Sequence, residues 1–166
     1  MDKKDIFIKE YLPYIIVIIV VLLIKAFVVT PIRVNGPSML DTLEDKDIMI
    51  LDEISFKFKG LKRFDIVVVN YKDEKIIKRV IGLPGETVEY KDNKLYIDGR
   101  EVKEEFSHEV TANVDSIKIP KNHYYVMGDN RVNSTDSRII GPVSIKNIKG
   151  TTKLTVFPFK RFGIKK

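Results

Sequence analysis

The 166-residue sequence contains no cysteine. Disulfide bonds and thiolate metal sites are therefore excluded. The chain is long enough for one domain with its own hydrophobic core and too short for two domains of ordinary size. A core of that size needs no disulfide, so an extracytoplasmic location stays open.

Nucleic-acid-binding motifs are also missing. The net charge of +6 could in principle indicate a nucleic acid or an anionic membrane surface as partner. The sequence has no helix-turn-helix, no zinc finger and no RNA motif of aromatic residues and glycine. We therefore expect no nucleic-acid partner, and a membrane becomes the better explanation of the charge.

A long apolar run lies near the N-terminus. Residues 11–24, YLPYIIVIIVVLLI, carry no charge, and the apolar stretch resumes after Lys25. Residues 11–29 are long enough to span the hydrocarbon layer, and a lysine near one end can extend to the lipid headgroups. The following residues lack an Ala-x-Ala cleavage pattern, and residues 1–10 mix both charge signs. We expect an uncleaved transmembrane anchor; a cleaved signal and a soluble helix are the alternatives.

The orientation of this anchor follows from a small charge bias. Lys3, Lys4 and Lys9 precede the run, whereas Lys25 and Arg33 follow it. Basic residues favour the cytoplasmic side. The sequence thus predicts a single-pass protein of the cell membrane, with residues 1–10 as a short cytoplasmic tail and residues 30–166 as an extracytoplasmic domain.

The rest of the chain has the pattern of a β protein. Short β-branched runs, among them DIVVVNY and KIIKRVIG, alternate with turn residues, and no long helical period follows Arg33. Residues 83–86 suit a type II turn, and residues 91–94 suit a hairpin. We predict a mainly β fold, antiparallel and barrel-like or coiled, with few helices. Residues 102–119 are polar and irregular and predict an excursion from the core sheet.

The stretch NGPSMLDTL, residues 35–43, contains a candidate nucleophile, Ser38. Ser38 and Asp41 also have the spacing of a helix capping box, which is the structural alternative. A nucleophilic serine needs a base. His108 lies in the polar excursion and His123 opens a strand, so both suit surface positions, although His123 stays a reserve candidate.

A buried lysine is the other possible base, because desolvation lowers the pKa of an ammonium group. In IIKRVIG, alternation places Ile76 and Val80 on the face of Lys78. Lys78 is therefore the candidate base. Its structural alternative is an edge-strand lysine that prevents aggregation.

Residues 128–138, GDNRVNSTDSR, are almost entirely polar. A solvated loop is one interpretation. A calcium loop is another, but Arg131 occupies a ligand position and the central glycine is missing. The hydroxyls and opposite charges suit a loop that positions another group, and Ser134 could hydrogen-bond an amine.

Taken together and in this order, these segments resemble bacterial type I signal peptidases, the membrane-bound serine proteases that remove signal peptides from exported proteins. The resemblance covers nearly the whole chain: an N-terminal anchor, then PSMLDTL, RFDIVVV, KRVIGLPGE and GDNRVNSTDSR. The single anchor and the compact length are similar to the short forms of Gram-positive bacteria.

The resemblance implies a Ser-Lys dyad, with Ser38 as nucleophile and Lys78 as general base. It implies that Ser134 hydrogen-bonds the lysine, that Asp129 pairs with Arg79, and that Asp136 pairs with Arg138. It further implies an oxyanion region at Gly36 and Ser38, and structural roles for Asp65, Gly82, Pro84 and Gly85. Shallow pockets for small side chains map to Val34, Met39, Leu43, Ile76 and Ile77.

Two residues depart from the family pattern. Asp41 stands where the family usually has proline, and we expect its carboxylate to point to solvent, since near the site it would oppose an oxyanion. Gly36 stands where some members have a hydroxyl, so the oxyanion would rely on the Ser38 amide and a further donor.

The implied reaction is cleavage of preprotein signal peptides after small residues in an Ala-x-Ala pattern, without metal or cofactor. Another Ser-Lys protease, such as a self-cleaving repressor, and a catalytically silent membrane-tethered β module that binds exported chains are the alternatives. A lipid-facing surface is also predicted, with ordinary strand packing as its alternative. It comprises five phenylalanines and the basic residues between them: Phe56, Phe58, Phe157, Phe159, Phe162, Lys57, Lys59, Lys160 and Arg161.

Overall fold

The computed structural model describes residues 3–26, 30–106 and 109–165. Its helices are α1 (Lys3–Ala26), α2 (Ser55–Lys59) and α3 (Ser137–Ile140), with single 3-10 turns η1 (Ile145–Asn147) and η2 (Phe159–Arg161). Its strands are β1 (Thr30–Arg33), β2 (Ile48–Asp52), β3 (Ile66–Tyr71), β4 (Glu74–Gly82), β5 (Thr87–Lys91), β6 (Lys94–Ile97), β7 (Arg100–Val102), β8 (Val114–Lys118), β9 (His123–Met127), β10 (Val143–Ser144), β11 (Ile148–Phe157) and β12 (Gly163–Ile164).

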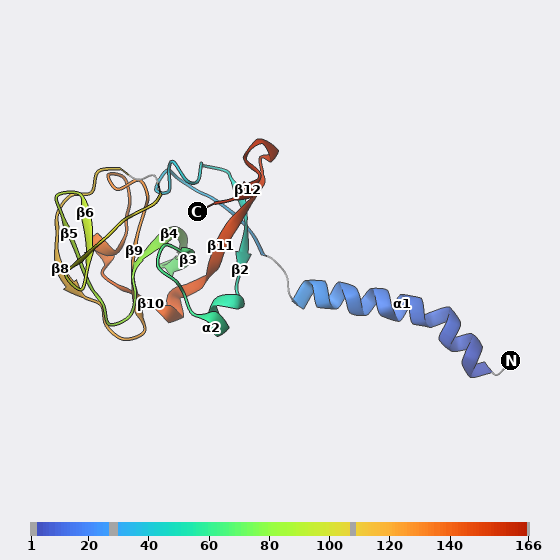
Figure 1. The fold of residues 1–166 in the computed structure, drawn as a ribbon. Coiled ribbons are helices and arrows are strands. Elements are labelled where there is room, and N and C mark those ends of the chain that lie inside the picture. The colour runs from blue at the N-terminus through green and yellow to red at the C-terminus, as the bar shows by residue number, and fades with distance from the viewer. Residues whose placement is uncertain (1–2, 27–29, 107–108, 166) are drawn as a thin grey trace.

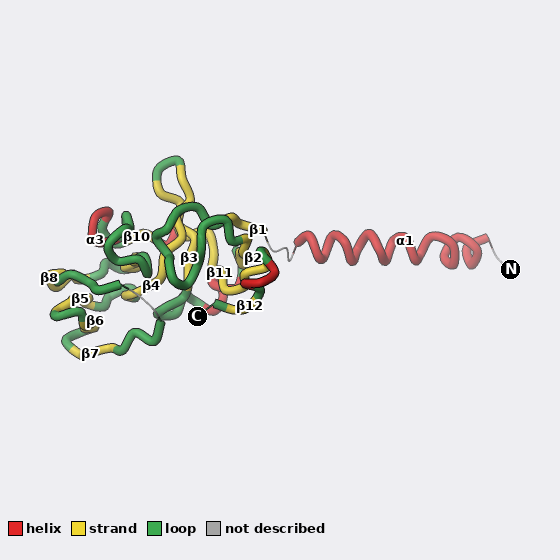
Figure 2. The backbone as a smooth tube through the Cα atoms, turned by 90° about the horizontal axis from the view of Figure 1, so that it is seen from above, coloured by secondary structure: helices red, strands yellow, loops and turns green. Residues whose placement is uncertain are grey.

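Helix α1 covers much of the predicted anchor and lies apart from the sheets in both views (Figures 1 and 2). It begins at Lys3, so it also includes most of the predicted tail. Residues 27–29, the end of the predicted span, lie outside the described residues. Within the residues that are described, no helix combines the length and the apolar character of a membrane span.

The β domain consists of two antiparallel sheets. The larger has eight strands in the order β1-β2-β11-β3-β4-β9-β10, with β12 added to β11. The smaller has four strands in the order β7-β6-β5-β8. The prediction of a mainly β, antiparallel fold is confirmed, and the predicted excursion contributes β8, which pairs with β5.

The predicted turns have a clear structural basis. Gly85 has a φ of +84°, as a type II turn requires, and the Glu86 amide donates to the Leu83 carbonyl. Lys91 and Lys94 pair across a hairpin whose central residues, Asp92 and Asn93, both have positive φ. The sequence predicted both turns correctly.

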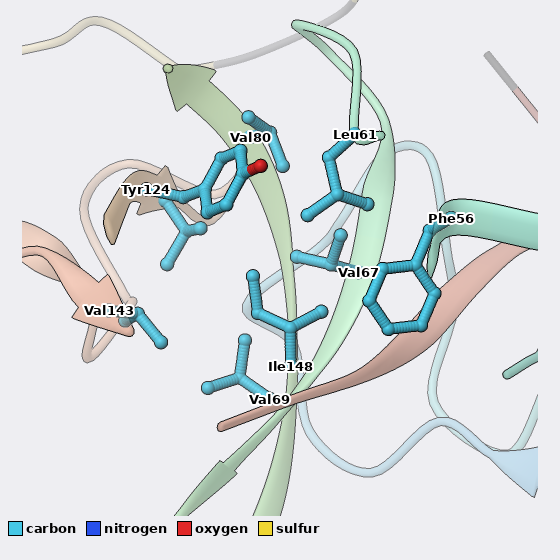
Figure 3. Close-up of a cluster of buried hydrophobic side chains, with 9 residues drawn as sticks. Phe56, Leu61, Val67, Val69, Val80, Tyr124, Val143 and Ile148 are labelled. Carbon is cyan, nitrogen blue, oxygen red and sulfur yellow. The ribbon is translucent and has the colours of Figure 1, made fainter. Parts of the chain in front are cut away.

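Three apolar clusters form the core. One lies around β3, β4 and β9 and includes Val67, Val80 and Tyr124 (Figure 3). A second lies between the Ser38 turn and β2 and β3, and a third fills the smaller sheet. Phe56 is buried in the first cluster, so its assignment to the lipid-facing surface was wrong. Phe58, Phe157, Phe159 and Phe162 are exposed.

Candidate active site

Ser38 lies in an irregular turn that follows β1. The residues after it form turns and no helix, so the capping interpretation was wrong. The Leu43 amide donates to the Met39 carbonyl, and the Asn130 amide donates to the carbonyl of Ser38 itself over 3.1 Å. The backbone of Ser38 is thus fixed by the loop that follows β9.

Lys78 lies in the middle of β4, with β3 paired along its strand and β9 pairing from Arg79 onward. It is only 2% exposed, so it is not an edge-strand lysine in contact with solvent. Its Nζ donates a hydrogen bond of 2.7 Å to Ser38 Oγ. Val80, which alternation placed on its face, belongs to the cluster of Figure 3, and Ile76, on the same face, packs against that cluster.

The environment of Lys78 changes its proton affinity. Burial lowers its pKa from 10.5 to about 8, although the nearby carboxylates of Asp136 and Asp129 oppose that change. A substantial fraction of the amine is therefore neutral near pH 8. A neutral amine that hydrogen-bonds a serine hydroxyl can accept its proton.

The loop after β9 holds two ion pairs beside the dyad. Arg79 Nε donates to Asp129 Oδ1 over 2.8 Å, and the Thr42 hydroxyl donates to Asp129 Oδ2 over 2.6 Å. Arg138 donates from Nε and Nη2 to Asp136 over 2.8 and 2.7 Å. Although burial opposes it, these bonds and the Gly128 amide hold the pKa of Asp136 below its usual value. The Asp136 carboxylate thus stays charged near Lys78.

Gly128 lies at the point where this loop meets the nucleophile. A Cβ atom at this position would collide with the Ser38 carbonyl oxygen and with the Ser134 hydroxyl. Only glycine lets the loop approach Ser38 so closely. Sequence reasoning did not single out Gly128, although it opens the polar loop GDNRVNSTDSR.

Ser134 lies in this crowded place but does not make its expected bond. Its Oγ is buried and makes no hydrogen bond of normal geometry to the described groups, although it lies close enough to the Asp136 carboxylate to help lower the pKa of that group. The predicted hydrogen bond between Ser134 and the Lys78 amine is therefore not formed in this structure, in which the amine donates to Ser38.

A groove runs past the dyad between β1 and β4. It is lined by residues of both strands and of the hairpin between β3 and β4: Pro31, Ile32, Arg33, Asn35, Ser38, Val68, Asp73, Glu74, Lys75, Ile76, Ile77 and Lys78. These strands stand first and fifth in the sheet order, so the larger sheet curls until they face one groove. From Glu74 to Lys78, β4 pairs only with β3 among the described strands.

The predicted pocket residues fall into two groups. Ile76 and Ile77 line the groove. Val34, Met39 and Leu43 do not line it, because they are buried in the cluster behind the Ser38 turn. Their assignment to the pocket wall needs correction, and Ile32 and Val68 take their place. No sequence pattern indicated Ile32, because its strand is only four residues long.

The predicted oxyanion region has a specific backbone geometry. Gly36 has a φ of +85°, and its amide donates to Asp45 Oδ1, so that amide is already engaged. Asp41 is exposed, as expected of its carboxylate. The reserve base, His123, bonds the Lys121 carbonyl at the start of β9 and does not line the groove. His108 lies outside the described residues.

A buried network behind the loop escaped the sequence analysis. Arg131 donates to the Gly128 carbonyl, the Tyr90 hydroxyl and Glu104, over 3.0, 3.1 and 2.5 Å respectively. Arg79 stacks on Phe106 with 4.0 Å from its Cζ to the ring centroid. Part of the predicted excursion therefore packs against the loop beside the dyad.

The remaining supports are structural. Asp65 accepts from the Lys62 amide and pairs with Lys153, and it closes the turn before β3. Gly82 faces Ile119 and Val88 with no room for a side chain. The described residues contain no group of three or more histidine, aspartate or glutamate side chains that could hold a metal ion.

Comparison with known proteins gives a consistent result. The family model described as signal peptidase, peptidase S26, matches residues 8–157. Signal peptidase I T of Bacillus subtilis is 40% identical over 87% of this chain and 82% of its own length. Signal peptidase I S of the same organism is 38% identical over 96% of this chain and 94% of its own. A crystal structure of a signal peptidase I from Enterococcus faecalis superimposes with a TM-score of 0.50 at 35% identity, covering 55% of this chain and 95% of that one.

Proposed function

Because the chain belongs to the signal peptidase family of serine endopeptidases, peptidase S26, we propose that it removes N-terminal signal peptides from exported preproteins with a dyad of Ser38 and Lys78. The observation that carries the proposal is the 2.7 Å hydrogen bond between the buried Lys78 amine and the Ser38 hydroxyl. Among the described lysines, only Lys78 hydrogen-bonds the serine that lines the groove.

The reaction begins when neutral Lys78 takes the proton of Ser38 as Oγ attacks the scissile carbonyl. The resulting ammonium group then protonates the leaving amine, and the signal peptide stays attached to Ser38 as an ester. Lys78 next takes a proton from the water that attacks the ester. It returns this proton to Ser38 Oγ as the ester bond breaks and the signal peptide leaves with a new carboxyl group. The Ser38 amide is the proposed donor to the oxyanion, together with a further donor supplied when substrate binds.

The groove suits an extended substrate. The free edge of β4 from Glu74 to Ile77 offers backbone groups to an added strand. Ile32, Val68, Ile76 and Ile77 give the groove an apolar floor, and we infer that small apolar side chains bind there, as cleavage after an Ala-x-Ala pattern requires. The buried Val34, Met39 and Leu43 support this floor from behind.

Asp129, Arg79, Asp136 and Arg138 are proposed supports of this site. Their two ion pairs fix the loop that bonds the Ser38 backbone, and their carboxylates moderate the pKa of Lys78. Ser134, buried beside Gly128, is proposed to bond the lysine once Ser38 is acylated and no longer accepts from it.

The location follows from the substrate and from the apolar N-terminal run. We propose that residues 11–29 anchor the protein in the cell membrane, with residues 1–10 in the cytoplasm and residues 30–166 on the outer face. Confinement of enzyme and preprotein to one membrane raises their effective concentration.

Mass spectrometry of a preprotein tests the proposal. A preprotein with an Ala-x-Ala site is incubated in detergent with wild type, Ser38→Ala, Lys78→Ala and Lys118→Ala, the last being an exposed strand lysine. Wild type and Lys118→Ala should cut after the second alanine, and the dyad variants should not. Cutting by Ser38→Ala would refute the nucleophile. A folded wild type that neither cuts nor labels at Ser38 with a serine-reactive probe would instead be a binding module.

A further inference from the structure

The short helix α2 carries the most exposed large apolar side chain of the described residues. Phe58 is 86% exposed, whereas Phe56, on the opposite face of the same turn, is buried in the core. Lys57 and Lys59 flank Phe58 and are also exposed. An aromatic ring standing in water between two lysines has the chemistry of a membrane-interface contact.

Two hollows beside α2 are lined in part by lysines, and they extend the positively charged surface around Phe58. One is lined in part by Lys57, Lys146 and Lys149, together with Glu53. The other is lined in part by Lys59, Lys62 and Lys153, together with Asp52 and Asp65. The three carboxylates are engaged internally, since Glu53 pairs with Lys149, Asp65 pairs with Lys153, and Asp52 accepts from the backbone at the start of α2. Six lysines against three carboxylates leave a basic surface around Phe58.

The chain enters the β domain beside this surface. Thr30, the first residue of β1, donates from its hydroxyl to Glu53, which lies just before α2. Thr30 also pairs with Leu51 at the same end of β2. A membrane anchor that ends at residue 29 therefore places α2 at the membrane surface, because Thr30 follows the anchor directly and contacts Glu53, which lies two residues before α2.

The exposed aromatic hairpin around η2 is the rival surface. Phe157, Phe159 and Phe162 are exposed there, but the hairpin lies at the other end of β11. Phe157 pairs with Ile48, whereas Thr151 pairs with Asp52 near α2. The two ends are about 20 Å apart at the usual rise per strand residue. Arg161, a basic residue of this hairpin, is neutralised by Asp47 and Glu44.

We propose that α2 is a membrane-docking element: the Phe58 ring enters the interface of an anionic bilayer, and the surrounding lysines bind its phosphate headgroups. The proposal rests on the membrane anchor of the proposed function. It deepens that function, because a second contact beside the anchor restricts rotation of the domain and fixes the height of the groove above the lipid.

Tryptophan fluorescence can test this directly, since the native chain contains no tryptophan. Full-length Phe58→Trp and Phe159→Trp are each reconstituted into vesicles of phosphatidylcholine with or without phosphatidylglycerol. Quenching by brominated acyl chains is then measured. Phe58→Trp should be blue-shifted and several-fold more quenched than Phe159→Trp, and more so with phosphatidylglycerol. Adding Lys57→Glu and Lys59→Glu should lower the quenching in anionic vesicles.

Three results would overturn the proposal. Phe58→Trp could emit as a fully hydrated residue without quenching, or Phe159→Trp could be quenched while Phe58→Trp is not. If the quenching depends neither on the lipid charge nor on the two glutamate substitutions, the lysines do not bind the phosphate headgroups. Alkaline extraction of the same vesicles separates these results from a failure of the anchor, because an anchored protein stays with the lipid. Preprotein cleavage in detergent checks that each variant is folded.

Discussion

Lys78 and Ser38 stand forty positions apart in sequence and meet through a 2.7 Å hydrogen bond from amine to hydroxyl. Because burial lowers the pKa of that amine to about 8, the base is mostly protonated at neutral pH. The cleavage rate should therefore fall about tenfold for each pH unit well below 8 and level off above it. Initial rates on a preprotein across this range check the prediction, and a flat profile would exclude Lys78 as base.

The charge of Asp136 should affect the pH at which the cleavage rate levels off. Its carboxylate is the first of the charges that raise the pKa of Lys78 against the effect of burial. Asp136→Asn removes the charge, so the rate should level off at a lower pH than in wild type, whatever happens to its maximum. Arg138 lowers the same pKa. Arg138→Gln should therefore move the profile in the opposite direction, and a shared direction for both variants would contradict this electrostatic account.

The buried lysine should also reduce stability at neutral pH. Its folded-state pKa of about 8 lies below the ordinary 10.5, so below pH 8 the folded protein holds a buried ammonium group. That depression corresponds to roughly 3 kcal/mol, from which a lost hydrogen bond removes about 1. Lys78→Met should therefore raise the free energy of unfolding by about 2 kcal/mol at pH 7 while abolishing cleavage.

The pH dependence of this gain has a definite sign. Between pH 8 and 10.5 the unfolded chain binds a proton at Lys78 that the folded chain does not, so wild-type stability rises with pH in this window. The advantage of Lys78→Met should shrink across the window and turn into a deficit of about 1 kcal/mol above it, because only the lost hydrogen bond then remains. Denaturant titrations of both proteins in one detergent provide the measurement, with Lys118→Met as a control that should show no such trend.

Gly128→Ala should damage catalysis more than folding. The added Cβ meets the Ser38 carbonyl and the Ser134 hydroxyl, so either the loop or the nucleophile must move. A displacement of about 1 Å can cost on the order of a hundredfold in rate. Gly85→Ala is the control, since its Cβ meets no atom and only its positive φ is strained. Wild-type kinetics in Gly128→Ala would show that the dyad does not depend on this contact.

Glu104 should be important for the stability of the fold although it does not line the groove. Glu104→Gln leaves the buried Arg131 without its charge partner, and breaking a buried pair costs on the order of 3–5 kcal/mol. Glu101→Gln breaks the exposed pair with Lys94 and should leave the unfolding midpoint unchanged. Thermal unfolding of the two variants decides the point, and equal midpoints would refute a structural role for the Arg131 network.

The sequence predicted what depends on local pattern. Alternation identified β3, β4 and β9, and the turn residues of 83–86 and 91–94 identified two connections, because strand faces and turn dihedrals are set within a few residues. Lys78 was found in the same way, from the apolar residues on its own strand face. The pairing of Ser38 with Lys78 came from the resemblance of four segments, since nothing local places position 38 beside position 78.

The predictions that failed needed tertiary information. Val34, Met39 and Leu43 are as apolar as Ile76 and Ile77, and only the path of the Ser38 turn decides which of them face the core. Phe56 and Phe58 differ because α2 is a helix, whose period turns the first inward and the second outward. The Arg131 network joins residues of three separate segments, and no spacing in the sequence predicts that they meet.

The free edge of β4 has a consequence for the range of substrates. Beside Lys78 the strand changes from pairing on both sides to pairing, among the described strands, with β3 alone. A chain bound there would be held chiefly through peptide groups, which every protein sequence possesses. Such binding tolerates variation at all but the side chains that face the groove floor, so one enzyme could process many unrelated secreted proteins.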